Sequence, residues 1–282
     1  LTCEALDLWL DEGTNDTKGS TGQRLATLTI AKAVAQGDSE KAPATIERRQ
    51  REIDPTGAPR LTQLVYLEGR LVEADNEAGT LRVPTAGRLL VERREHAQAQ
   101  PLRAEDDGNA MARLAGSPGT TLFEWQGQLL LDRPRGVAAM TKQVRMRHLP
   151  RGAAEAAMIE CERMEATFDT ADAPDEAASR LRLTKAEARG AVYAAMGLRE
   201  LIADALLYDA RKAALAARAN PPNAIILFDR SQPTPLTGSA LVWRLDEDRV
   251  EWRDAGTLSA PAAGIVTAQP SAEQAPPPPL HE

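Results

Sequence analysis

Hydrophobic and polar residues alternate along much of this chain. In the segment 143–149, every second residue from Val144 onward is Val, Met or His, and the residues between them are polar or charged. The segments 6–11, 241–246 and 249–253 show the same period of two. Because successive side chains of a strand point to opposite faces, this pattern predicts half-buried antiparallel strands of about five to seven residues.

Turn-forming residues separate these alternating segments. The stretches 75–79, 132–136 and 246–248 are rich in Asp, Asn, Gly or Pro, and each lies between two apolar segments. Short strands at such regular spacing are typical of a sandwich, a barrel or a solenoid. The predicted fold class is therefore all-β.

One segment has a composition that favours a different structure. Residues 186–219 are rich in Ala, Leu, Arg and Glu, which are good helix formers. Gly190, Gly197 and Asp209 nevertheless interrupt the segment at intervals of about one strand. Since strand propensity yields readily to tertiary context, we expect strands here as well.

Two other segments lack clear alternation. Residues 36–60 are polar, charged and punctuated by proline, and we expect an irregular loop there with a short helical excursion at 44–51. Residues 97–118 mix Asp, Gly, Ala and Pro, which is typical of a loop or linker.

The chain also contains a distant internal match. Residues 1–11 and 159–169 read alike, and each contains one of the only two cysteines, Cys3 and Cys161, followed by Glu. Internal repetition indicates stacked structural units that share a continuous core. Both cysteines lie between apolar and acidic residues, so we expect small buried core residues rather than a disulfide bond or metal ligands.

The match divides the chain into two predicted repeats and a tail. The first repeat covers 1–150, with loops at 36–60 and 97–118, and the second covers 155–262. Residues 263–282 contain a run of prolines, so we expect a disordered, Pro-rich tail.

Composition excludes several classes of function. The net charge is −7, so there is no basic footprint for a nucleic-acid backbone, and no nucleic-acid partner is expected. An aromatic content of 4% argues against a groove that stacks sugars or bases. No apolar run reaches the roughly 18 residues of a membrane-spanning helix. The chain begins with Leu1 rather than Met, so we expect an excised segment whose missing leader says nothing about export.

Candidate catalytic chemistry is sparse in the sequence. The histidines are His96, His148 and His281, and none has a Cys, Asp or Glu at metal-ligand spacing. No nucleophile elbow, phosphate-binding loop or dinucleotide-binding fingerprint follows a predicted strand. The sequence therefore predicts no catalytic residues, no metal site and no cofactor. His148 is expected to be a satisfied interface residue rather than a catalytic base.

A set of short motifs in the second half carries a family resemblance. Gly190-Ala-Val192 is followed by Ala-Asp-Ala-Leu-Leu-Tyr-Asp at 203–209 and then by a hydrophobic strand after Pro221. In this order they resemble the OstA/LptA-type β-jellyroll of lipopolysaccharide transport. The turn differs, because Ala219 stands where the family has glycine. The resemblance covers about 180–260 and, through the internal repeat, 1–95 more weakly.

This resemblance implies an elongated, open β-jellyroll or solenoid with an apolar trough. Acyl chains would lie in the trough, where each buried CH₂ contributes about 0.8 kcal/mol. The edge strands at both ends would add to strands of other β-jellyroll envelope proteins. The implied partners are lipopolysaccharide or another lipid, and the implied location is the periplasm or envelope of a bacterium with an outer membrane. The apolar side chains expected to line the trough are Leu6, Leu8, Leu10, Leu81, Val83, Leu89, Val91, Val144, Met146, Met164, Phe168, Leu215, Ile225, Leu227, Val250 and Trp252.

Two alternatives remain open from the sequence. A structural assembly scaffold would use the same strand edges without lipid, and its core would be closed by side chains. A β-helical polysaccharide-active enzyme would need several acidic or basic side chains in a cleft on one outer face. An open trough with a continuous apolar lining distinguishes a lipid-binding protein from the scaffold.

Overall fold

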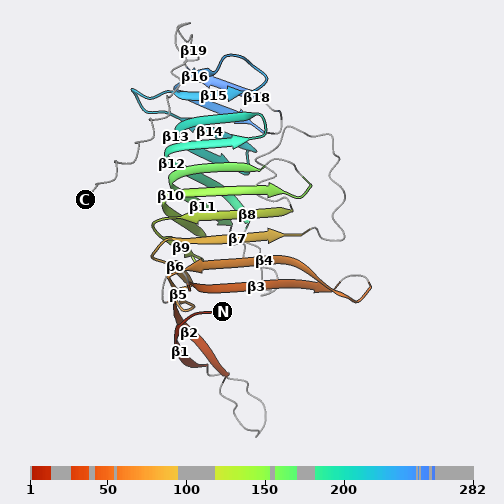
Figure 1. The fold of residues 1–282 in the computed structure, drawn as a ribbon, viewed down its shortest axis with the longest axis vertical. Coiled ribbons are helices and arrows are strands. Elements are labelled where there is room, and N and C mark those ends of the chain that lie inside the picture. Colours follow the sequence, from red (N-terminus) through yellow and green to blue (C-terminus); the bar gives the residue numbers. More distant parts are fainter. Residues whose placement is uncertain are drawn as a thin grey trace, which may run out of the picture.

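All the described residues build one open antiparallel sheet of nineteen strands, which confirms the predicted all-β class (Figure 1). No helix occurs within this part of the chain. The computed structural model describes residues 2–13, 27–37, 42–53, 56–94, 118–152, 156–169, 182–245, 247, 249–253 and 256–257.

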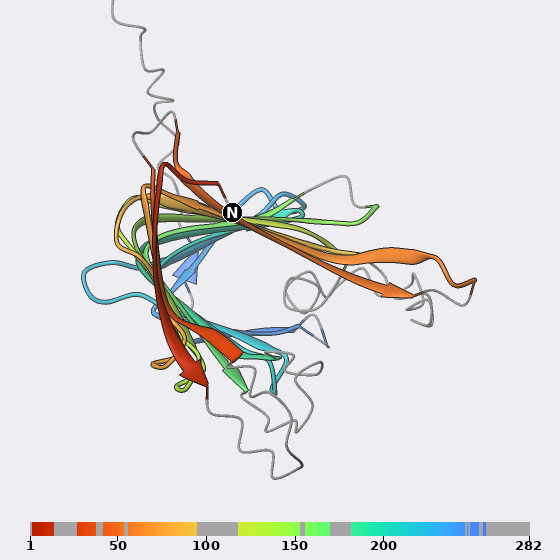
Figure 2. The same ribbon diagram turned by 90° about the horizontal axis from the view of Figure 1, so that it is seen from below.

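The sheet is folded lengthwise into two arms, which form a V when seen along the long axis (Figure 2). The strands confined to the first arm are β3 (Ala44–Ile53), β4 (Pro59–Gly69), β7 (Gly87–Arg93), β8 (Gly119–Trp125), β15 (Ile225–Asp229), β16 (Leu236–Gly238) and β19 (Gly256–Thr257).

The second arm has its own series of strands, which lie beside those of the first arm. The successive strands along the V are here called its rungs. Its strands are β1 (Ala5–Gly13), β2 (Thr27–Gln36), β5 (Leu71–Asp75), β6 (Thr80–Val83), β9 (Leu129–Asp132), β14 (Ala214–Arg218), β17 (Ala240–Arg244) and β18 (Arg249–Arg253). Four long strands run through both arms and join them: β10 (Val137–Pro150), β11 (Ala157–Asp169), β12 (Arg182–Met196) and β13 (Arg199–Asp209).

The corner of the V lies where the long strands bulge. The registers of β10 with β11, β11 with β12 and β12 with β13 all shift in this region. Gly190 has a φ of +80°, and a Cβ there would lie 2.8 Å from the Cβ of Glu162. Bulges bend a strand and re-aim its side chains, and glycine adopts the positive φ without strain. Stacked bulges therefore turn the long strands from one arm into the other.

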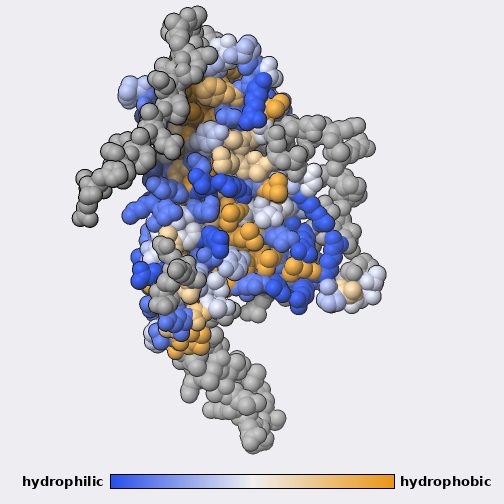
Figure 3. Space-filling model, viewed as in Figure 1, coloured by the Kyte–Doolittle hydropathy of each residue, from blue (hydrophilic) through white to orange (hydrophobic). Residues whose placement is uncertain are grey.

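Outside the V, the first arm carries a row of charged residues across several strands. Glu68, Arg88, Glu124, Arg145 and Glu160 stand opposite one another on successive strands of the first arm. The Arg88–Glu68 pair is 2.7 Å apart, and the Arg145–Glu160 pair is 2.6 Å apart. Figure 3 views this outer face, where hydrophilic surface surrounds smaller apolar patches. Such exposed ion pairs each contribute little to stability, but their charges keep this face of the sheet hydrated.

The predicted strands and turns agree with the structure at most positions. The segment 186–219, whose composition favours helix, forms β12, β13 and β14 as expected. Residues 75–79 and 132–136 form turns between strands. The predicted loop at 97–118 and the predicted tail at 263–282 lie outside the described residues, apart from Pro118.

The expectation for 36–60 was wrong. Residues 44–51, predicted as a helical excursion, belong to β3, and β4 begins at Pro59. β3 pairs with β4 along its whole length, from Ala44 opposite Gly69 to Ile53 opposite Pro59. Charged residues such as Arg48 and Arg49 favour a helix by propensity, but pairing along the whole length of β3 outweighs that preference.

The two matching segments lie in different strands, and each of these strands pairs with the strand that follows it along the chain. Residues 5–11 lie in β1, which pairs with β2, and residues 159–169 lie in β11, which pairs with β12. The sheet continues without interruption between β10 and β11, across the proposed boundary at 150–155. The division into two repeats stays a prediction.

Candidate functional site

The inner face of the first arm carries one uninterrupted row of apolar side chains, here called the first-arm row. Each member stands directly opposite the next on the neighbouring strand, so all of them share one face of the sheet. The row begins at Ile46 on β3 and ends at Leu236 on β16. Its members are Ile46, Leu67, Leu89, Phe123, Met146, Ile159, Ala194, Leu201, Leu227 and Leu236.

The inner face of the second arm carries a second complete row, the second-arm row. It crosses twelve strands from β1 to β18 without a polar interruption other than the hydroxyl of Tyr208. Its members are Leu8, Ala33, Ala74, Leu81, Leu131, Ala138, Ala166, Ala186, Tyr208, Leu215, Trp243 and Val250.

A third row, the corner row, runs beside the second-arm row and closer to the bend of the sheet. Most of its members are buried. It consists of Leu6, Ala35 and Val72, and then of Val83, Leu129, Met140, Met164, Ala188, Leu206, Ala217, Leu241 and Trp252.

The side chains predicted to line a trough lie on this inner face wherever they are described. Leu6, Leu8, Leu81, Val83, Leu89, Met146, Met164, Leu215, Leu227, Val250 and Trp252 belong to the three rows. Val91, Val144, Phe168 and Ile225 lie two residues along a strand from a row member and therefore share its face. The side chain of Leu10 lies outside the described residues.

Burial along the second-arm row changes abruptly at Tyr208. Leu8 is 46% exposed, and the seven members from Ala33 to Ala186 are half-buried. Tyr208, Leu215 and Trp243 are 5% exposed or less. The half-buried part is dominated by alanine, whereas the buried part carries a phenol, a leucine and an indole. The second-arm row is thus only half-buried over β2 to β12, and it is buried over β13 to β17.

An interaction between the arms marks the filled part. The guanidinium of Arg199, on the first arm, lies 4.8 Å from the ring centroid of Trp243, on the second arm. The same guanidinium pairs with Asp229 at 3.2 Å, and both side chains of that pair are mostly buried. A cation over an indole ring in a partly desolvated place is attracted by the ring quadrupole. The two arms are therefore joined at β13 and β17.

Polar side chains occupy the inner face of the first arm toward its free ends. His148 is 2% exposed, and its Nδ1 lies 2.8 Å from the hydroxyl of Thr121 on the neighbouring strand. Burial, and secondarily the positive charge of Arg93, lower the pKa of His148 below the ordinary 6.5. The ring is therefore neutral at pH 7. Arg48 and Gln63 also lie on this part of the inner face.

The two cysteines are both free, and they differ in burial. Cys161 is buried at the corner, where desolvation raises the pKa of its thiol to about 11, so it is protonated and unreactive near neutral pH. Cys3 is half-buried. Within the described ranges, no three His, Cys, Asp or Glu side chains come close enough together to hold a metal ion.

Sequence reasoning missed the residues that decide where the inner face is open. Ala33, Ala74, Ala138, Ala166 and Ala186 were not singled out, because alanine gives a weak signal in an alternating pattern. Tyr208 and Trp243 were recognised only as parts of motifs and strands. The alternation of Tyr208 with Leu206, and of Trp243 with Leu241, was the available signal for their inward orientation.

Comparison with known proteins shows a distant structural likeness. No family model matches the sequence, and no curated protein matches it. A solved structure of LptH, the LptA-homologous periplasmic component of the lipopolysaccharide transport device from Pseudomonas aeruginosa, superimposes with a TM-score of 0.38 and 10% identity. The superposition covers 51% of this chain and 96% of LptH. A likeness as loose as this does not by itself indicate function. Among the described residues, no helix is long and apolar enough to cross a membrane.

Proposed function

We propose that this chain is a non-enzymatic lipid-binding protein of the bacterial cell envelope, which holds acyl chains between the two arms of its sheet. The observation that carries the proposal is the pair of unbroken apolar rows on the inner faces, half-buried along most of the second arm. A continuous apolar lining left partly exposed is unfavourable in water unless something covers it.

Burial of hydrocarbon supplies the driving force for this binding. Each CH₂ moved from water to the lining contributes about 0.8 kcal/mol, so one acyl chain offsets a large entropic cost of association. A lipid headgroup would remain near the polar residues of the first arm, such as Arg48 and Gln63. Lipopolysaccharide or another lipid of the envelope fits this chemistry, and a periplasmic location with other β-jellyroll proteins as partners belongs to the same proposal.

The outermost strands support the proposed partner docking. β1 and β3 lie at the N-terminal edge of the two arms, and the bridge between Thr2 and Thr45 pairs only one position of β3. Exposed edge strands are templates for strand addition.

A matched pair of variants tests lipid binding. Ala138 lies in the second-arm row, and Ala139, its neighbour on the same strand, faces outward opposite Glu165. Both side chains are half-buried. We expect Ala138→Asn to weaken binding of lipid A to the delipidated protein by about tenfold or more, because a buried amide without a partner costs about 1–3 kcal/mol. Ala139→Asn should bind like the unmodified protein.

The same lipid titration also tests the alternative function, a structural scaffold. If the delipidated protein takes up neither lipid A nor phospholipid, lipid binding is excluded and a structural scaffold that uses the strand edges becomes the better account. Equal weakening of lipid binding in both variants would indicate a loss of folding rather than a change in the apolar lining. Circular dichroism of the two proteins distinguishes these cases.

A further inference from the structure

The apolar lining has a definite end within the sheet. Along the second-arm row, the half-buried stretch runs over seven neighbouring strands, from β2 to β12. With strands about 4.8 Å apart, this stretch is about 29 Å long. Since a bilayer core of about 30 Å holds two layers of acyl chains, one chain of about 15 Å fits within it lengthwise.

Beyond this stretch, larger side chains occupy the inner face of the second arm. Ala166 and Ala186 are followed on the next strands by Tyr208 and Leu215, and then by Trp243. Leu215 is 0% exposed, and Tyr208 and Trp243 are each 5% exposed. Burial raises the pKa of Tyr208, so the phenol is neutral and packs as part of the apolar core. No comparable aromatic residue stands in the row before Tyr208.

The two arms also touch each other at this end. Arg199 reaches from the first arm to the indole of Trp243 on the second arm, and its ion pair with Asp229 fixes its position. An acyl chain that moved along the inner face would have to displace a cation–π contact and an ion pair that are both largely shielded from water. Removing one partner of such a pair leaves an uncompensated charge.

We propose that Tyr208, Trp243 and Arg199 form a stop that ends the acyl-chain site. This proposal rests on the proposed lipid binding and adds a direction to it. Acyl chains enter from the N-terminal rungs or from the open side of the V, and they do not continue past β13 toward the C-terminal edge. The chain is then a receiver or holder of lipid with one open end, and it is not a channel that passes acyl chains through both ends.

Site-specific photocrosslinking tests the stop with the full chain. A photoreactive phenylalanine analogue is placed at Leu81, in the open stretch, or at Val250, the row member beyond Trp243. After incubation with lipid A, we expect labelling at Leu81 to exceed labelling at Val250 by about tenfold, which corresponds to about 1.4 kcal/mol. Removing the stop with Tyr208→Ala, Trp243→Ala and Arg199→Ala together should bring Val250 to the level of Leu81. Tyr208→Phe, which keeps the ring, should leave the ratio unchanged.

The outcomes separate the two proposals. Equal labelling of Leu81 and Val250 in the otherwise unmodified chain overturns the stop and leaves lipid binding intact. Absence of label at both positions overturns lipid binding itself. Label confined to Leu81 in the triple variant, with native circular dichroism, shows that these three side chains are not what ends the site. Arg199→Met is the milder variant to use if the triple variant does not fold, and it should raise labelling at Val250 in the same direction.

Discussion

The N-terminal and C-terminal rungs of this sheet share one backbone architecture and differ in what fills it. Over β2 to β12 the second-arm row is mostly alanine and half-buried, whereas over β13 to β17 it is Tyr208, Leu215 and Trp243, all buried. The strand pairing is antiparallel and continuous in both regions. Side-chain volume, and not the course of the backbone, therefore decides whether the second-arm row is half-buried or closed at a given rung of the V.

This difference bears on two hypotheses that the sequence left open. A closed core is what a structural scaffold needs, and an open apolar lining is what a lipid-binding protein needs. The molecule has both, in different rungs. The closed rungs supply the packing that holds the arms together, and the open rungs supply the proposed site.

The largest expected effect comes from truncating the closed core. Trp243→Ala should lower the free energy of unfolding by about 3–5 kcal/mol, because it leaves a cavity and removes the ring beneath Arg199. Leu8→Ala, in the same row but 46% exposed, should change it by less than about 1 kcal/mol. Urea denaturation followed by tryptophan fluorescence or circular dichroism measures both. Similar losses in the two variants would contradict the distinction between closed and open rungs.

Enlarging a side chain, rather than truncating one, also tests the difference between the closed and open rungs. Ala217 is 1% exposed in the corner row of the closed rungs, so Ala217→Leu should destabilise the fold by about 1–3 kcal/mol through overpacking. Ala138 is half-buried, so Ala138→Leu should leave stability within about 0.5 kcal/mol of the original. Ala138→Leu should nevertheless reduce lipid capacity, because the added side chain occupies the lining. Thermal unfolding with a parallel lipid titration gives both quantities.

Acidification is expected to act on the first arm through His148. Its pKa is lowered in the folded state, so below about pH 6.5 the unfolded chain binds a proton more readily than the folded chain. The contribution of the neutral, Thr121-bonded ring is complete above pH 6.5 and is lost as pH falls through the folded-state pKa. We expect the unfolding midpoint to fall more between pH 7 and pH 5 in the unmodified protein than in His148→Gln. Parallel pH profiles for the two proteins would contradict this role.

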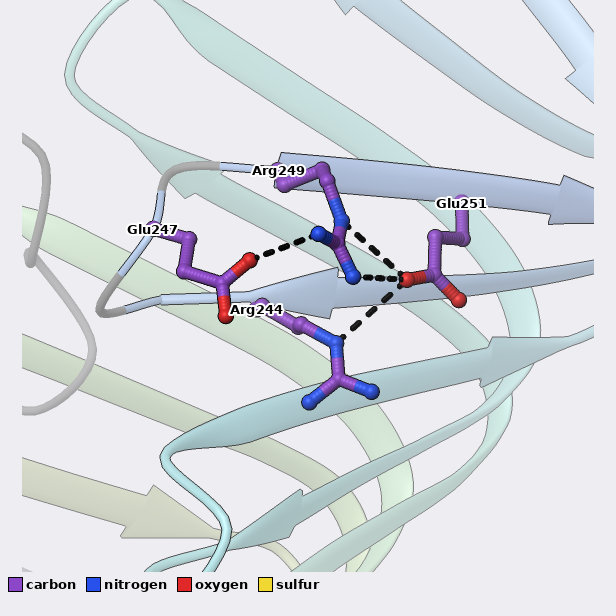
Figure 4. A network of polar contacts seen from close by, with 4 residues as sticks. All are labelled: Arg244, Glu247, Arg249 and Glu251. Atoms are coloured by element: carbon purple, nitrogen blue, oxygen red, sulfur yellow. Dashed lines mark hydrogen bonds and ion pairs between the residues drawn. The ribbon is translucent and has the colours of Figure 1, made fainter.

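The smallest effect is expected on the outer face. Arg249 pairs with Glu247 at 2.9 Å and with Glu251 at 2.6 Å, and Glu251 also accepts from Arg244 at 3.3 Å (Figure 4). All of these side chains are about half exposed, so water and salt screen the network. Arg249→Gln should leave the unfolding midpoint and lipid binding unchanged within error. A marked loss of either would mean that the C-terminal edge depends on this network.

Much of the fold follows from local patterning in the sequence. The alternation at Val144, Met146 and His148 fixes which side of β10 is buried, and the structure confirms it. The segment 44–51 was mistaken for helix because Glu47, Arg48 and Arg49 favour helix locally, while its pairing with β4 depends on residues farther along the chain.

The extent of the open stretch could not be predicted, because it depends on register. Ala74, Ala138 and Ala186 come from segments far apart in sequence, and they form one row only because their strands pair in a particular alignment. The contact between Arg199 and Trp243 requires, in addition, that the two arms meet at one end. Neither alternation nor motif order encodes these relations.

The central claim is that the open rungs hold acyl chains. Native mass spectrometry of the protein purified without detergent, followed by lipid extraction, tests it most directly. The account predicts a bound lipid at close to one per chain, lost in Ala138→Asn and retained in Ala139→Asn. A lipid-free mass that stays unchanged after addition of lipid A or phospholipid would contradict it.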